Sequence, residues 1–76
     1  MVETFELITF RVGDVEHVLR TGKGKPAETI VAVMTEYAER LNNPMIRKIP
    51  VFAELLKSGK LEGTTVINIE EHEYKR

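Results

Sequence analysis

The segment TFELITFRVGDVEHVLR, residues 4–20, decides the fold of this chain. Residues 4–12 and 15–20 are rich in β-branched and aromatic side chains, which is typical of strands. Between them, Gly13-Asp14 is a two-residue loop with glycine first, as a type II′ turn requires. We therefore expect a β-hairpin.

A two-residue turn also fixes which side chains lie together, because side chains alternate between the two faces of a strand. One face is expected to carry Ile8, Phe10, Val12, Val15, His17 and Leu19. The opposite face is expected to carry Leu7, Thr9 and Val18. The second face is less polar than a fully solvated one would be.

Two helices are expected after the hairpin. Pro26 suits the first turn of a helix that ends before Asn42-Asn43-Pro44. Its apolar stripe consists of Ile30, Met34, Tyr37, Ala38 and Leu41. A second helix is expected over residues 50–58, ending at Gly59. Residues 45–49 fit either a helical turn or a short edge strand.

A last strand is expected over residues 64–70, and the tail, residues 71–76, either extends this strand or frays. The prediction is a single α+β domain, residues 1–76, of order ββααβ, with both helices on one face of a three-stranded sheet. The last strand could lie beside the first strand or, in antiparallel direction, beside the second, and of these we favour the place beside the first, in sheet order 2-1-3. Because two antiparallel helices would return the chain to the start of the first strand, it should run parallel to that strand.

The order of elements resembles that of the ubiquitin-like β-grasp, whose chains also open with a hairpin and a helix. The resemblance does not extend to modifier chemistry, because the chain ends in Tyr74-Lys75-Arg76 without a Gly-Gly pair.

Composition limits the classes of function. Eleven basic residues oppose twelve acidic ones, so net charge gives no general attraction to nucleic acid or anionic membranes. The longest apolar run, residues 30–34, is far shorter than the ~20 residues of a membrane span. The N-terminal residues do not resemble a signal peptide, and cysteine is absent, which together predict a cytoplasmic protein.

No catalytic, cofactor or metal site is predicted. Ser58, the only serine, precedes a helix-ending glycine and lies in no nucleophile motif. His17 faces the apolar side of the hairpin, where a structural role is expected. Glu70 and His72 share a strand face, yet a charged tail is usually only solvated. A chain this small also has little room for a pocket of about 300–1,000 Å³.

Two surfaces remain as binding candidates. Arg20, Lys23 and Lys25 belong to a glycine-lysine loop before the first helix, a pattern that suits anion binding although the spacing is not that of a P-loop. The other is the face of the sheet away from the helices, where Leu7, Thr9, Val18 and Val66 are expected to meet a protein partner.

We therefore predict a small non-enzymatic regulator, inhibitor or adaptor that binds a protein through a face or edge of its sheet. Such compact chains are typical of accessory or phage-encoded regulators. Self-association into a homodimer fits a small chain without disulfides. The alternatives are a nucleic-acid or phosphate binder that uses the glycine-lysine loop and, third, a small enzyme with its site at a dimer interface.

Overall fold

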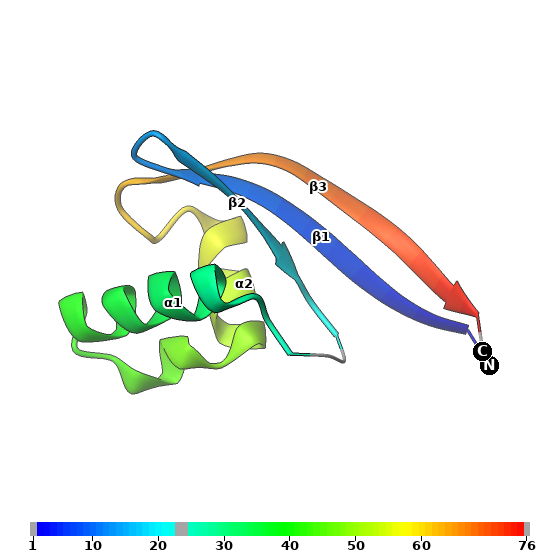
Figure 1. The fold of residues 1–76 in the computed structure, drawn as a ribbon, viewed down its shortest axis with the longest axis horizontal. Helices are drawn as coiled ribbons and strands as arrows, with labels where there is room; N and C mark the ends of the chain where they lie inside the picture. Colours follow the sequence, from blue (N-terminus) through cyan, green and yellow to red (C-terminus); the bar gives the residue numbers. More distant parts are fainter. Residues whose placement is uncertain (1, 23–24, 76) are drawn as a thin grey trace.

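A computed structural model describes residues 2–22 and 25–75 and consists of two layers, a three-stranded antiparallel sheet and the helices beneath it (Figure 1). The elements are β1 (Val2–Val12), β2 (Val15–Arg20), α1 (Glu28–Arg40), the 3₁₀ helix η1 (Pro44–Arg47), α2 (Ile49–Ser58) and β3 (Thr64–Lys75). The predicted α+β class and ββααβ order are confirmed. No helix of the described ranges is long and apolar enough to cross a membrane.

The hairpin forms as predicted. Phe10 pairs with His17 and Ile8 pairs with Leu19. Gly13 has a φ of 59°, and Asp14 is not among the described residues with positive φ, which is the combination that a type II′ turn requires. Glycine adopts this left-handed conformation without steric cost, so the turn residue itself enforces the register.

β3 lies beside β1, and the sheet order β2-β1-β3 is confirmed. The expected parallel direction is wrong, because β3 runs antiparallel to β1, with Thr64 opposite Val12. Two contacts hold the connection from α2 to β3 in place. The Tyr37 hydroxyl, near the end of α1, donates a hydrogen bond of 3.0 Å to the Glu62 carbonyl, and the Leu61 side chain is buried in the core. Because of these contacts, β3 begins at the hairpin-turn end of the sheet, where β1 ends. β3 therefore runs in the direction opposite to β1.

The tail extends β3 rather than fraying, and Lys75 pairs with Val2. β1 likewise begins earlier than expected, at Val2. Residues 2–6 and 71–75 together form a two-stranded ribbon, called the arm here, which projects beyond the helices (Figure 1). The arm makes the molecule elongated, with extents of 39 × 23 × 22 Å.

The core lies between the sheet and the helices. Its twelve buried apolar residues are Ile8, Phe10, Leu19, Ile30, Met34, Tyr37, Ala38, Ile46, Phe52, Ala53, Leu56 and Leu61. Phe52 is at the centre, because its ring meets the ring of Phe10 edge-on at 5.9 Å and lies 6.3 Å from that of Tyr37. These contacts join the sheet to both helices.

The helical segments differ in detail from the prediction. α1 begins at Glu28, after an N-cap at Ala27, so Pro26 precedes the helix instead of lying in its first turn. Of the ambiguous residues 45–49, residues 45–47 belong to η1 and Ile49 begins α2, while Lys48 between them is extended. Leu41, expected in the core, is 47% exposed, because the chain leaves the helix at Arg40 and turns through Asn42 at positive φ.

Leu61, in the connection after α2, is therefore a core residue, whereas Leu41, which has the helical spacing of one, is not. We expect Leu61→Ala to lower the free energy of unfolding by about 2–5 kcal/mol, as for other buried leucines, and Leu41→Ala to lower it by less than about 1 kcal/mol. Urea denaturation of both variants measures the difference. Equal losses would contradict the placement of Leu61 in the core.

Candidate functional site

The helices cover one face of the sheet and leave its outer face, on the opposite side, uncovered (Figure 1). Thr9 pairs with Val18 at its centre, and Leu7 lies beside them on the same face. Val18 is 51% exposed, whereas Leu7 and Thr9, on the central strand, are half-buried. The predicted grouping of these three residues is therefore confirmed.

Val66 does not belong to this face, and its expected position there is wrong. A β-bulge shifts the pairing of β1 with β3: Thr9 lies opposite Asn68, but Phe10 lies opposite Val66. The extra residue reverses the alternation of the strand. Val66 consequently packs against the core, and Asn68 takes the position beside Thr9.

A ladder of stacked side chains crosses all three strands near the base of the arm. The Arg20 guanidinium of β2 lies 4.5 Å from the centre of the Phe5 ring, and the His72 ring of β3 stacks on Phe5 at 5.3 Å. His72 Nε2 also lies 3.2 Å from the Glu70 carboxylate. The expected Glu70–His72 proximity is thus confirmed, whereas the stacking on Phe5 was missed, because it depends on the antiparallel register of β3.

The predicted absence of a catalytic group stays a prediction, but the geometry separates the candidates. His17 stacks on Phe10 at 5.5 Å on the helix-facing side of the sheet, and His72 lies on the outer face. The Ser58 hydroxyl donates to the carbonyl of Leu55 within its own helix. Within residues 2–22 and 25–75, no three His, Cys, Asp or Glu side chains are grouped to bind a metal ion.

A hollow of about 460 Å³ lies where the arm leaves the helices, between β1, the end of β2 and α2. Its apolar wall consists of Ile49, Pro50 and Ala53. Its volume falls within the range of ligand pockets, and is thus larger than the chain length led us to expect.

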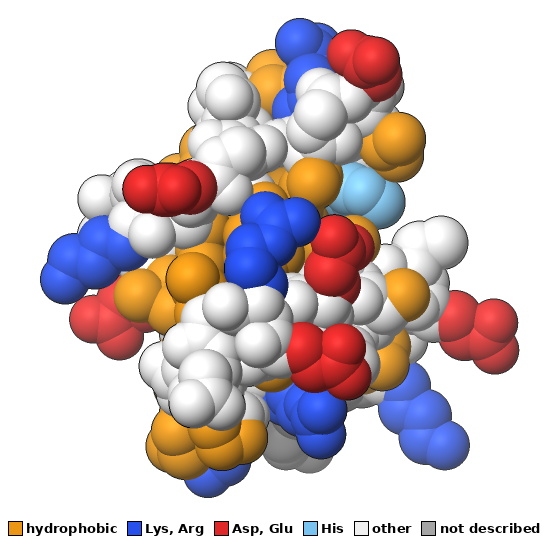
Figure 2. Space-filling view, turned by 90° about the vertical axis from the view of Figure 1, so that its left-hand side faces the viewer, with side chains coloured by type: hydrophobic (Ala, Val, Ile, Leu, Met, Phe, Trp, Pro, Cys, Tyr) orange, Lys and Arg blue, Asp and Glu red, His pale blue; other side chains and the backbone are white. Residues whose placement is uncertain are grey.

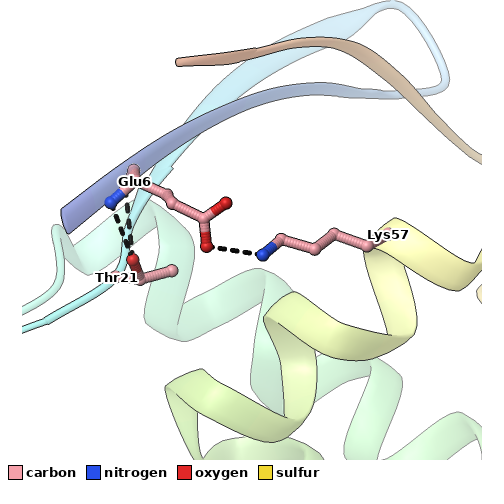
Figure 3. A network of polar contacts seen from close by, with 3 residues as sticks. All are labelled: Glu6, Thr21 and Lys57. Carbon is pink, nitrogen blue, oxygen red and sulfur yellow. Dashed lines mark hydrogen bonds and ion pairs between the residues drawn. The ribbon is translucent and has the colours of Figure 1, made fainter. Parts of the chain in front are cut away.

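Three polar residues of this hollow, Glu6, Thr21 and Lys57, form structural contacts with one another (Figure 3). Lys57 of α2 reaches across to pair with the carboxylate of Glu6 on β1. The Thr21 hydroxyl accepts from the Glu6 backbone N–H over 2.9 Å and also lies 3.4 Å from the Glu6 carbonyl as a donor. Thr21 thereby continues the β1–β2 pairing by one residue.

The glycine-lysine loop is partly described. Lys23 lies outside the described residues. Arg20 and Lys25 line the same hollow of about 170 Å³, beside the start of α1. The N-terminus of α1 has no side-chain cap, and Lys25 lies near its exposed backbone N–H groups, whereas the Arg20 guanidinium lies over the Phe5 ring.

Charge elsewhere is mixed. Figure 2 looks onto the end of the molecule at the left of Figure 1, which includes the hairpin turn and the end of α1, and acidic and basic side chains alternate there with apolar ones. This end therefore lacks the single-sign patch that nucleic-acid binding surfaces show.

The stacked ladder should stabilise the arm. Replacing Phe5 with alanine removes both stacking contacts, worth about 1–2 kcal/mol together. We expect faster amide hydrogen exchange at residues 3–5 and 71–73 in Phe5→Ala, with unchanged exchange in the core. Arg11→Ala, on the same face at the other end of β1, is the control. Unchanged exchange in the arm would show that the ladder contributes nothing.

Comparisons with protein-family models, with curated proteins and with solved structures give no match to this chain. The resemblance to the β-grasp thus stays one of element order. No relative supplies a function, which has to be inferred from the residues of the chain itself.

Proposed function

We propose that this chain is a non-enzymatic protein-binding module, acting as a regulator, inhibitor or adaptor that covers a partner's surface with the outer face of its sheet. The observation that carries the proposal is the apolar centre of this face, Leu7, Thr9 and Val18, which no helix covers. An antiparallel sheet that served only as scaffold would present a more polar outer face.

Charged residues flank that centre at both ends. The register places Arg11 and Glu16 on the outer face toward the hairpin turn, and Arg20 and Glu70 toward the arm. An apolar centre with a polar rim of both signs is the usual composition of a protein–protein interface. The same mixture is unfavourable for a polyanion, because half of the rim would repel it.

The polar groups that could support catalysis have other roles, which also favours binding over chemistry. The hydroxyls of Thr21 and Ser58 form hydrogen bonds to the backbone, and the two histidines stack on phenylalanine rings. We place the protein in the cytoplasm, where a chain without cysteine needs no oxidising environment.

Anion binding is a second candidate function, supported by one observation. Arg20 and Lys25 both line a hollow beside the uncapped N-terminus of α1, where backbone N–H groups and the helix dipole favour negative charge. Phosphate groups of a nucleotide or a nucleic acid are the ligands that this arrangement suits.

Val18→Lys tests the protein-binding proposal, because it places a charge at the centre of the outer face without touching the core. Tagged wild-type chain should retain a specific protein from a lysate of its source organism after nuclease treatment, and Val18→Lys should not. Val31→Lys, at a site of 46% exposure on α1, is the matched control and should retain the protein. A partner retained equally by all three chains would contradict the proposal.

Lys25→Gln tests the anion site. We expect weaker binding to a fluorescent oligonucleotide and a slope of log K against log salt reduced by about 1, the loss of one phosphate contact. Lys60→Gln, exposed and after α2, removes the same charge elsewhere and should change neither. Absence of wild-type binding at low salt would exclude this second function.

A further inference from the structure

We propose that two copies of this chain pair antiparallel along the free edges of β3, so that their sheets join across a two-fold axis. This goes beyond the protein-binding proposal, because it uses the edge of the sheet and leaves the outer face accessible.

β3 is a long and open edge. It has twelve residues, and in the described part of the chain its only strand neighbour is β1. Two large apolar side chains of this strand are exposed, Ile67 by 47% and Ile69 by 44%. A long edge with exposed apolar residues is a template for a further strand, whose backbone groups would pair with those of β3.

The charge pattern of β3 selects a second copy in antiparallel orientation. Residues 64–69 carry no charge, whereas Glu70, Glu71 and Glu73 follow directly. A pairing centred on Asn68 sets Ile67 of one copy opposite Ile69 of the other. Glu70 and Glu71 of one copy then lie beside the uncharged residues 64–66 of the other copy, where the bulge next to Val66 interrupts strict alternation.

Other ways of pairing two identical edges are less favourable. Parallel strands in register would align every glutamate with its own copy, and like charges directly opposite are destabilising. An antiparallel pairing centred on Glu71 would also bring two carboxylates together. The uncharged half of β3 is therefore complementary to itself in one orientation only.

The arm gives a second reason. A two-stranded ribbon is marginally stable in water, and residues 2–5 have no strand neighbour besides β3 in the described chain. In the proposed dimer, residues 64–66 of the second copy lie beside residues 70–72. The base of each arm thereby becomes part of a wider sheet.

The surface area of the chain is consistent with such a contact. The accessible surface is 5526 Å². A compact monomer of 8.7 kDa would expose about 4,700 Å². The excess of roughly 800 Å² reflects the elongated shape of the molecule, and the exposed Ile67 and Ile69 side chains of β3 contribute to the apolar part of the exposed surface.

Disulfide trapping tests the register directly, because the chain contains no cysteine. In Asn68→Cys the two introduced thiols face each other across the two-fold axis, within the Cα separation of about 4.4–6.8 Å that a disulfide spans. We expect rapid cross-linking of Asn68→Cys under mild oxidation. Thr65→Cys and Glu71→Cys, whose copies would be about 20 Å apart, should stay monomeric on a non-reducing gel.

Sedimentation equilibrium provides the thermodynamic test. Wild type should dimerise, and Ile69→Lys should raise the dissociation constant about tenfold or more, since a two-fold contact receives two lysines. Val15→Lys, at an even more exposed site of 57% on β2, is the matched control and should dimerise normally. Circular dichroism of each variant verifies that it is folded.

The possible results separate this proposal from the protein-binding one. A wild type that stays monomeric at the highest reachable concentration, or equal cross-linking at all three cysteine positions, overturns the β3 dimer. A dimer that Val18→Lys disrupts and Ile69→Lys does not would also overturn it, by moving the contact to the outer face. A foreign partner lost in Val18→Lys alone supports the outer face whatever the fate of the dimer.

Discussion

The register of the β1–β2 hairpin is the constraint on which the rest of the structure depends. Gly13 in the left-handed conformation closes a turn of two residues, and this places Ile8, Phe10 and Leu19 together on one face at full burial. A slip of one residue would turn those three side chains toward solvent, because neighbouring residues of a strand point to opposite faces. Both helices and β3 pack against the surface that this turn defines.

The shortness of the chain explains why so much of the sheet is uncovered. A domain of this size buries only about 60% of the surface of its unfolded chain. Its two helices cover one face of the sheet near Phe52, while the outer face and the arm remain accessible (Figure 1). The arm is kept in place by pairing with β3 and by the contacts of Phe5 with Arg20 and His72. Each of these surfaces gains stability if another molecule covers it.

The polar side chains at the edge of the core mainly connect elements of the fold. Tyr37 ties α1 to the connection before β3, Thr21 extends the hairpin pairing, and Lys57 links α2 to Glu6. The two hydroxyls satisfy backbone atoms that would otherwise be costly at partly buried positions, and the Lys57–Glu6 pair joins two elements distant in sequence.

Turn chemistry and periodicity act over a few residues, and they were sufficient to predict the local features, namely the hairpin with its register, the two helices and the strand near the C-terminus. The direction of β3 was decided by contacts distant in sequence, above all the burial of Leu61. The same is true of the faces of Val66 and His72, since the bulge and the antiparallel register arise only when β3 meets β1. Leu41 had the spacing of a core residue yet is exposed, because α1 ends before that position is covered. Periodicity reports which side chains share a face, whereas burial depends on what the complete fold places against that face.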